Sequence, residues 1–426
     1  MNSLGIIFYN LILVPLGFMA VHLFALFDQK MRKGLTGRRE TWKELRRFGK
    51  NRLSKDLYII HSASLGEFEQ AKPVIKGLKA VRPDLLIVAS FSSPSGFENV
   101  QHIEEVDLFI YLPFDTFFRT RHLIQRLKPQ KIIFITYELW PNLIVNAKRH
   151  KVQTYLISAR IRKKSLKWRP IVKAFFRSLY RSLDYIYTVS EDDRESVKRL
   201  VRSDKIEVIM LGDTRYDQVL QRANEKIKLK MPSIFDSGFT FIGGSIWPQD
   251  ARHVLPALIK LIKRNPSFNV ILAPHEPNDY ALEMLEDEFI QQNIKTERLS
   301  RHTGDNRGVK VVLVDKVGIL AELYHLSDLA FVGGSFRGSI HNVMEPAVAG
   351  LPVLFGPTYH NSREAEELVK DRGGYCCEHA DCFYNKLEVF VSKGEVYNRA
   401  SKAARNVVMK NIGASARTVN QILGYS

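Results

Sequence analysis

Short apolar runs recur along the chain from residue 56 onward, and polar segments of helix length separate them. Uninterrupted runs of valine, isoleucine, leucine and phenylalanine between helical patterns are typical of parallel strands buried on both faces. The pattern therefore predicts alternating strands and helices. The first series of expected strands comprises residues 57–62, 85–91, 108–112, 131–136, 152–158, 185–189 and 206–211.

A second series of apolar runs follows a polar helical stretch at residues 218–230 and Pro232. Two such series predict two doubly wound α/β sheets in tandem. Ligands of open parallel sheets bind beyond the carboxyl ends of the strands, so the residues just after each run are the candidates for function. The strands expected in the second series are residues 239–243, 268–273, 309–314, 329–332 and 352–355.

The first run ends in a segment of small residues that includes Ser64, Gly66 and Glu67. Gly66 permits a tight turn from strand to helix, which places Glu67 near the start of the next helix. A carboxylate at that position can take a proton from an attacking hydroxyl, or it can simply complement the helix dipole. The residues by themselves leave both interpretations open.

Glu138 follows the fourth run, in the string Glu-Leu-Trp-Pro-Asn at residues 138–142. A carboxylate, a large aromatic ring and a turn-forming residue at a strand end suit an edge that binds a sugar. The same string equally suits the start of a helix, with Pro141 near its first position.

In the second half, Gly-Gly-Ser occurs twice directly after an expected strand, at residues 243–245 and 333–335. Glycines there let the backbone approach a phosphate, and the N–H groups of the following turn or helix can bind it. The second copy precedes Asn342 and Glu345, which open a predicted helix. The pair predicts a nucleotide site, with Glu345 accepting hydrogen bonds from the ribose hydroxyls.

Residues 4–27 form an apolar run of 24 residues without Asp, Glu, Lys or Arg, long enough to cross a hydrocarbon core of about 30 Å. A signal peptide carries its positive charge before the apolar run, whereas here the basic residues follow it. The run therefore predicts a spanning or deeply inserted membrane anchor with the globular body on the cytoplasmic side. A buried core helix, or an interfacial helix interrupted by Pro15 and Gly17, remains the alternative.

The net charge of +18 points to an anionic partner, and its distribution indicates which one. Residues 28–55 contain eleven basic and three acidic residues, directly behind the apolar run, where a membrane surface is the natural counter-ion. The remaining charge fits a protein whose substrates are anionic. Nucleic acid is the least expected partner, because the aromatic residues lie mostly inside strand runs rather than among basic ones.

Several enzyme classes lack their signature in this chain. There is no G-x-G-x-x-G after the first run, no Walker loop and no H-E-x-x-H, which disfavours a dehydrogenase, a P-loop NTPase and a zinc hydrolase. Asp-x-Asp is also absent, which disfavours a sugar transferase that holds a diphosphate through a metal. Neither a metal nor a cofactor is therefore expected.

Taken in order, these motifs resemble those of the 3-deoxy-D-manno-octulosonic acid (Kdo) transferases over nearly the whole chain. The resemblance rests on residues 61–67, 138–142, 158–160, 211–217, 244–245, 273–276, 317–319 and 332–345. It implies an α/β protein of the GT-B fold, in which two Rossmann-like domains face a cleft. It also implies transfer of Kdo from CMP-Kdo to the 6′-hydroxyl of lipid IVA, a lipid A precursor in lipopolysaccharide synthesis, at the bacterial inner membrane.

The resemblance further implies a domain organisation. We expect a membrane anchor at residues 1–28, an acceptor domain at 29–215 and a CMP-sugar-binding domain at 216–404. The C-terminal segment, with residues 400–423 as a helix, is expected to cross back so that residues 405–426 complete the acceptor domain.

The family's site maps onto this chain residue by residue, with Glu67 as the general base. The donor site is expected at Gly244, Ser245, Pro274, His275, Val317, Gly318, Ile319, Gly334, Ser335, Asn342 and Glu345. Acceptor or phosphate contacts are expected at Ser64, Gly66, Glu138, Arg160 and Arg215. Basic residues at 32–55 and 160–167 are further phosphate candidates, unless they form a solvated or lipid-facing surface.

This chain departs from the family pattern at two donor positions. His275 stands where many members carry an arginine after the proline, so His275 either replaces that arginine or does not. Val317, Gly318 and Ile319 replace a common Met-Gly-Glu string, so contacts made there by side chains are in doubt and contacts made by the backbone are not.

Two other functions compete with the transferase. A sugar-nucleotide 2-epimerase acting on UDP-N-acetylglucosamine has the same architecture, although it needs no membrane anchor. A membrane-tethered protein that only binds anionic partners would also account for the charge.

Overall fold

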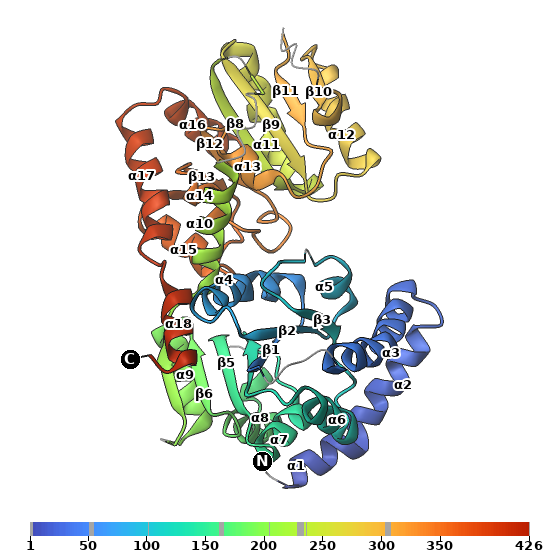
Figure 1. Ribbon diagram of the computed structural model, residues 1–426. Coiled ribbons are helices and arrows are strands. Elements are labelled where there is room, and N and C mark those ends of the chain that lie inside the picture. The colour runs from blue at the N-terminus through green and yellow to red at the C-terminus, as the bar shows by residue number, and fades with distance from the viewer. Residues whose placement is uncertain are drawn as a thin grey trace. The chain divides into compact units, whose positions relative to one another are not determined.

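The computed structural model describes residues 3–50, 55–100, 102–161, 166–203, 205–227, 234–235, 237–302 and 308–425. Arg52, Pro232 and residues 162–165 and 228–230, which carry some of the sequence-based expectations, lie outside the described residues. The chain forms two compact units. Unit 1 comprises Met1–Gln218 and Ile412–Ser426, and unit 2 comprises Val219–Asn411 (Figure 1).

Unit 1 is built on a seven-stranded parallel sheet in the order β3-β2-β1-β4-β5-β6-β7. All seven strands coincide with the predicted runs to within about two residues at each end. Its strands are β1 (Leu57–Ser62), β2 (Leu86–Phe91), β3 (Leu108–Tyr111), β4 (Lys131–Ile135), β5 (Gln153–Ala159), β6 (Tyr185–Thr188) and β7 (Glu207–Met210). The order reverses between β1 and β4, which is where a doubly wound sheet binds its ligand.

Helices cover both faces of this sheet and bury an apolar layer on each. The hydroxyl of Ser64 caps α4 by accepting from the backbone N–H of Glu67, and Pro141 occupies the first position of α7. The helices are α4 (Leu65–Val81), α5 (Pro94–Glu98), α6 (Phe117–Leu127), α7 (Pro141–Arg149), η2 (Leu166–Trp168), α8 (Pro170–Tyr180), α9 (Glu191–Val201), the start of α10 (Thr214–Ile227) and α18 (Ala414–Leu423).

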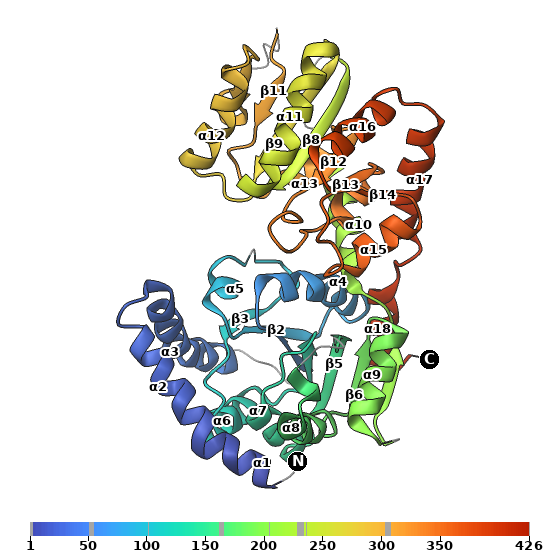
Figure 2. The ribbon, with the colours of Figure 1, turned by 180° about the vertical axis from the view of Figure 1, so that it is seen from behind.

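The apolar N-terminal run is a helix, as predicted. It consists of α1 (Ser3–Phe8), a π-helical turn (Tyr9–Leu13) and α2 (Val14–Phe24), after which α3 (Gln29–Lys50) folds back beside it. Figures 1 and 2 both show α2 lying next to α3 and α6 at one side of unit 1. The stretch Gly5–Phe24 is long and apolar enough to cross a membrane, and none of its most apolar window is buried.

Unit 2 is built on a second seven-stranded parallel sheet, in the order β10-β11-β9-β8-β12-β13-β14. Its strands are β8 (Phe239–Ile246), β9 (Phe268–Pro274), β10 (Thr296–Arg298), β11 (Val311–Leu313), β12 (Leu329–Val332), β13 (Val353–Phe355) and β14 (Gly374–Cys376). The five predicted strands are present, and the two edge strands, β10 and β14, were not predicted. Here the order reverses between β8 and β12.

One predicted helix is wrong. Residues 400–423 form the end of α17 (Glu395–Met409) and the separate helix α18, because Gly413 adopts a left-handed φ of 89° and breaks the helix between them. The remaining helices of unit 2 are α11 (Pro248–Arg264), α12 (Asp279–Ile290), η3 (Leu299–Arg301), α13 (Leu320–Tyr324), α14 (Met344–Val348), α15 (Arg363–Lys370) and α16 (Ala380–Val391).

Helix α18 packs on α4, so the C-terminal segment completes unit 1. A Cβ atom on Gly77 of α4 would lie 2.8 Å from a methyl carbon of Val419, which explains the glycine at this crossing. Asp217 fastens the start of α18 by accepting hydrogen bonds from the backbone N–H groups of Gly413 (2.6 Å) and Ser415 (2.7 Å).

Candidate active site

Glu67 lies in the first turn of α4, beyond the carboxyl end of β1, as its position in the sequence predicted. The side chain is 6 % exposed, and Oε2 accepts a hydrogen bond of 2.5 Å from the backbone N–H of Ala63. Gly66 beside it has an ordinary helical backbone, and a Cβ atom there would meet nothing within 4 Å. The turn therefore does not require a glycine, and Gly66 instead leaves open space next to the carboxylate.

The environment of Glu67 keeps its proton affinity high. Burial raises the pKa of Glu67 to about 7, the hydrogen bond from Ala63 opposes that shift, and the charge of Glu138 adds to it. Glu138 lies after β4, so the two carboxylates flank the point where the strand order of unit 1 reverses. A carboxylate with a pKa near neutrality is matched to general base catalysis.

The positive charge of Lys167, which precedes α8, acts on Glu138. Burial raises the pKa of Glu138, and the charge of Lys167 opposes the shift. Burial lowers the pKa of Lys167 to about 8, and its Nζ donates to the hydroxyl of Tyr180 at 2.7 Å. An acidic pair and a lysine thus share the strand ends of unit 1.

A hydrogen bond between the side chains of His61, in β1, and Trp140, in the segment after β4, connects the ends of these two strands. The indole N–H of Trp140 donates to Nε2 of His61 at 2.8 Å, and Nδ1 of His61 lies 3.0 Å from the hydroxyl of Ser90. His61 is fully buried, and burial lowers its pKa to about 3. His61 is therefore neutral at physiological pH and serves as a structural link between β1, β2 and the segment after β4.

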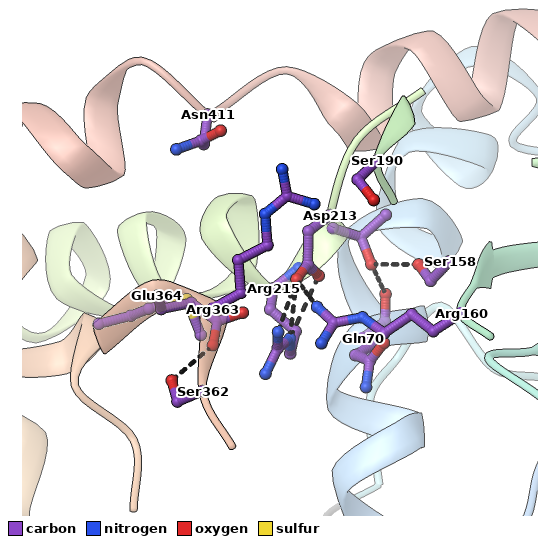
Figure 3. A network of polar contacts seen from close by, with 12 residues as sticks. Gln70, Ser158, Arg160, Ser190, Asp213, Arg215, Ser362, Arg363, Glu364 and Asn411 are labelled. Carbon is purple, nitrogen blue, oxygen red and sulfur yellow. Dashed lines mark hydrogen bonds and ion pairs between the residues drawn. The ribbon is translucent and has the colours of Figure 1, made fainter. Parts of the chain in front are cut away.

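Arg160 and Arg215 converge on one buried carboxylate (Figure 3). Arg215 donates to Asp213 from Nε and Nη2 at 3.0 and 2.7 Å, and Arg160 forms a second ion pair with the same Oδ2. Burial acts to raise the pKa of Asp213, but the two guanidinium groups hold it below its usual value. Two arginines on one carboxylate keep a net positive charge, which suits a phosphate.

The two Gly-Gly-Ser segments of unit 2 touch each other at the reversal between β8 and β12. The backbone N–H of Gly333 donates to the carbonyl of Gly244 at 2.9 Å, and a Cβ atom on Gly333 would lie 2.1 Å from the carbonyl oxygen of Ser245. Only the second segment follows its strand as predicted. The first forms the last part of β8, where Ser245 has a left-handed φ of 55°.

Asp250, in the first turn of α11, connects both segments. Its fully buried carboxylate accepts from the backbone N–H groups of Trp247 (3.0 Å), Gly334 (2.7 Å) and Phe336 (3.2 Å). The hydroxyl of Ser335 is also engaged, because it accepts from the N–H of Gly356 at 2.6 Å. The N–H groups of Gly334 and Phe336, which were expected to face a phosphate, therefore already bind a carboxylate of the chain itself.

A stack of rings follows the strand ends of β8, β9 and β12. The ring of His275 lies between those of Trp247 and His341, with centroid distances of 4.2 and 4.4 Å. The indole N–H of Trp247 donates to Nε2 of His341 at 2.9 Å, and Arg337 lies 3.6 Å above the indole. Burial, and then the charges of His275 and Arg337, lower the pKa of His341.

Glu345 and Gly318 are held by one arginine of α10. Arg222 pairs with Oε1 of Glu345 at 3.3 Å and donates to the carbonyl of Gly318 at 3.2 Å. Val317 beside it is 80 % exposed, and Gly318 has a left-handed φ of 85°. Asn342 stabilises the start of α14, because its Oδ1 accepts a hydrogen bond from the backbone N–H of Met344 at 3.0 Å.

The predicted residues thus form two groups, one in each unit. Most of them lie beyond the carboxyl end of a strand, whereas Gly244, Ser245 and Pro274 belong to the last residues of β8 and β9. The structure adds four residues that the sequence did not assign to the site, namely Asp213, Arg222, Asp250 and His61. Arg222, Asp250 and His61 bind partners far away along the chain. Asp213 binds both the neighbouring Arg215 and the distant Arg160. Among the described residues, no cluster of three His, Cys, Asp or Glu side chains could hold a metal ion.

Comparison with known proteins agrees with the motifs. Residues 40–218 match the family described as 3-Deoxy-D-manno-octulosonic-acid transferase (kdotransferase). The Kdo transferase of Haemophilus influenzae is 26 % identical over 386 residues, covering 86 % of this chain and 86 % of that protein. The Kdo transferase of Aquifex aeolicus is 28 % identical over 317 residues, covering 74 % and 80 %. The resemblance to the Kdo transferases is therefore confirmed.

Solved structures show the fold alone, because their sequences are distant. A UDP-GlcNAc 2-epimerase from Neisseria meningitidis aligns with a TM-score of 0.62 at 15 % identity, covering 87 % of this chain and 100 % of that one. A glycosyltransferase from Rickettsia africae aligns with a TM-score of 0.54 at 11 % identity, covering 88 % and 100 %. Together with the two parallel sheets, these neighbours confirm the predicted α/β class and GT-B type.

Proposed function

We propose that this chain, a relative of the Kdo transferases, moves Kdo from CMP-Kdo to the 6′-hydroxyl of lipid IVA with inversion at the anomeric carbon. The observation that carries the proposal is Glu67, a buried carboxylate with a raised pKa at the reversal point of the sheet in unit 1. A residue that only complemented a helix dipole would need neither burial nor a second carboxylate beside it.

Glu67 acts as the general base. One oxygen is held by the N–H of Ala63, so the other is available to the acceptor hydroxyl. As the bond between the anomeric carbon and the phosphate oxygen breaks, the hydroxyl oxygen bonds to that carbon from the opposite face. Its proton passes to Glu67, and CMP leaves with the electron pair of the broken bond.

Unit 2 holds the donor. Gly244, Ser245, Gly334 and Ser335 shape the floor of the site, and Asp250 keeps that floor rigid. Glu345, oriented by Arg222, accepts from the ribose hydroxyls. The remaining donor contacts come from Pro274, His275, Val317, Gly318, Ile319 and Asn342. Nδ1 of His341 is the protonated nitrogen of that ring, because Nε2 accepts from Trp247, so it can donate to an anionic group.

Unit 1 holds the acceptor. Ser64, Gly66 and Glu138 surround the base, and Arg160 with Arg215 supplies positive charge for a phosphate group. The base belongs to unit 1 and the donor residues belong to unit 2.

We further propose that the N-terminal helix associates with the cytoplasmic face of a bacterial inner membrane. Its apolar side chains are exposed, among them Leu11 (72 %) and Leu23 (59 %), and the basic helix α3 follows it. The helix also makes hydrogen bonds to unit 1 through Tyr9 and Asn10. A helix bound to the globular unit along its length fits lateral insertion into one leaflet better than a free span.

Incubation of the purified full chain in detergent with CMP-Kdo and lipid IVA tests the reaction. We expect CMP release coupled to a glycolipid heavier by one Kdo residue, and loss of at least about 100-fold in rate for Glu67→Gln. The matched control is Glu69→Gln, two residues further along α4, where the carboxylate binds Lys72 and Gln218. Equal rates for Glu67→Gln and the parent would refute the assignment of the base. Conversion of UDP-N-acetylglucosamine to its 2-epimer would favour the epimerase instead.

A further inference from the structure

The N-terminal helix is fixed to unit 1 by polar contacts that an anchor alone does not need. The hydroxyl of Tyr9 donates to Oδ2 of Asp115 at 2.9 Å, and Asn10 exchanges two hydrogen bonds with Asn142 at 3.1 and 2.8 Å. Asp115 is buried and also accepts from the backbone N–H groups of Asn142 and Leu143, both at 2.9 Å. These contacts place one face of the helix against the strand ends of unit 1.

A cavity of about 450 Å³ lies between that helix face and the strand ends. This volume is within the range of about 300–1,000 Å³ of ligand pockets. One wall consists of apolar residues of the helix, among them Leu13, Val14 and Val21. The lining also includes Leu112 and Phe114, from the segment after β3.

The lining of the same cavity also includes polar residues, one of which belongs to the proposed acceptor site. Ser93, Glu138, Trp140 and Arg38 line it, and Glu138 is the residue whose charge acts on Glu67. Arg38 donates to the carbonyls of Ser92 (2.5 Å) and Gly34 (3.0 Å), while its buried Nε has no hydrogen-bond partner among the described residues. This apolar trough, whose lining also includes the carboxylates of Asp115 and Glu138 and the guanidinium of Arg38, is suited to an amphipathic molecule.

Arg38 also lines a neighbouring cavity of about 430 Å³ on the other side of Phe18 and Phe114. The described residues around it include Arg39, Arg119 and two histidines and no carboxylate. Positive charge therefore gathers at the edge of the apolar trough. A lipid with phosphate groups on its head and acyl chains behind them complements both features.

We propose that the cavity between the N-terminal helix and the strand ends holds an acyl chain of the lipid acceptor, so that the helix forms part of the substrate site. The identity of the lipid rests on the proposed function; the presence of an acyl chain rests on the cavity. Gly17 is the critical position, because it lines the cavity and a Cβ atom there would meet nothing within 4 Å. The absent side chain leaves the trough open.

Substitution of Gly17 tests the proposal without disturbing the helix. Gly17→Ala, Gly17→Leu and Gly17→Phe add progressively more side chain to the trough and keep the segment apolar. We expect the KM for lipid IVA to rise along this series, by at least about tenfold for Gly17→Phe, with the KM for CMP-Kdo and the thermal midpoint unchanged. The matched control is Leu16→Phe, which adds bulk at a side chain that is 53 % exposed and does not line the cavity. An unchanged KM in the whole series overturns the proposal.

A photoreactive acceptor analogue with a diazirine in an acyl chain supplies a readout that does not depend on turnover. We expect cross-links to the segment around Leu112 and Phe114, abolished by Gly17→Phe and retained in Leu16→Phe. Cross-links confined to the exposed helix face overturn the acyl-chain site. If the parent releases no CMP yet shows the expected cross-links, the proposed reaction fails and the acyl-chain site stands.

Discussion

Oε2 of Glu67 lies 2.5 Å from the backbone nitrogen of Ala63, so the last residue before the helix cap orients the carboxylate at the start of that helix. The contact uses one oxygen of the carboxylate and leaves the second for a substrate proton. It also opposes the effect of burial on the pKa, which still stands at about 7. The position and the proton affinity of the base are therefore set by the same turn.

The first prediction concerns the pH dependence of transfer. Only the ionised form of Glu67 accepts a proton, so kcat/KM should rise with pH below about 7 and level off above it. Glu138→Gln removes a negative charge that raises this pKa and should move the inflection to lower pH. Initial rates of CMP release between pH 5 and 9 measure both. The Glu69→Gln variant should keep the inflection of the parent, and a profile without an inflection between pH 5 and 8 contradicts the role of Glu67.

The second prediction concerns stability. The folded protein holds a proton on Glu67 up to about pH 7, whereas in the unfolded chain the carboxyl ionises near its ordinary value of 4.5. Folding therefore binds a proton between these values, and this contribution to the free energy of unfolding is lost as pH rises through that window. Glu67→Gln does not ionise. We expect the thermal midpoint of Glu67→Gln, relative to that of the parent, to increase as the pH rises from 4.5 to 7. Above pH 8 the difference between the two midpoints should be constant. A difference independent of pH across this window would show that Glu67 titrates normally.

Most strands, and the residues at their carboxyl ends, could be predicted from the sequence. Continuous apolar runs revealed all seven strands of unit 1, because strands buried on both faces leave no polar alternation. The edge strand β10 (Thr296–Arg298) escaped detection because its three side chains are polar. The edge strand β14 (Gly374–Cys376) escaped detection because three residues that begin with glycine form no recognisable apolar run. The break at Gly413 was missed because a single glycine is also tolerated inside a helix.

The residues of the candidate site also fall into two sets, those that the sequence predicts and those that only the structure reveals. Glu67 and Glu345 could be named because each stands in a local string at a strand end. Asp250 and Arg222 could not, since their meaning arises from contacts with residues 84 and 123 positions away. A carboxylate in the first turn of a helix and an arginine in a polar helix are ordinary in sequence. Asp250 links the two Gly-Gly-Ser segments only because β8 and β12 are neighbours in the folded sheet.

The third prediction tests that link. Asp250→Ala leaves the buried N–H groups of Trp247, Gly334 and Phe336 without their acceptor, which should cost at least about 3 kcal/mol in the free energy of unfolding. Asp250→Asn retains one acceptor oxygen and should lose less. Urea unfolding of both variants measures the difference. If Asp250→Ala is as stable as the parent, the carboxylate does not hold the two segments together.

The fourth prediction concerns the basic cavity beside Phe18. Arg39→Gln and Arg119→Gln each remove one positive charge from its lining. We expect weaker binding of the phosphorylated acceptor and a smaller dependence of its KM on salt, because exposed charges act through screened attraction. The KM for CMP-Kdo should stay the same. Kinetics at 50 and 300 mM NaCl, compared with an acceptor that lacks one phosphate, separate a specific phosphate contact from general attraction to a basic surface. Unchanged acceptor kinetics in both variants contradict a phosphate at this cavity.

The fifth prediction concerns Arg222, which bridges Glu345 and the carbonyl of Gly318 within unit 2. Arg222→Ala frees Glu345 from its ion pair and releases the segment at Gly318, so the donor should bind more weakly. We expect the KM for CMP-Kdo to rise by about tenfold, with a smaller change in kcat, because Arg222 positions a binding residue and not the base. Arg222→Lys keeps the positive charge but lacks the planar, bidentate donor geometry of the guanidinium. This variant should therefore recover only part of the donor affinity that Arg222→Ala loses.

The neighbouring residue of α10 provides the control for Arg222. Gln221 is half-buried, and its amide donates to Oε1 of Glu225 on the same helix at 3.0 Å, so Gln221→Ala should leave both KM values unchanged. Calorimetric titration with CMP alone separates donor binding from turnover. A merely structural role for Arg222 would lower the thermal midpoint and leave the affinity of the folded protein for CMP intact. Weaker CMP binding at an unchanged thermal midpoint instead assigns Arg222 to the orientation of Glu345.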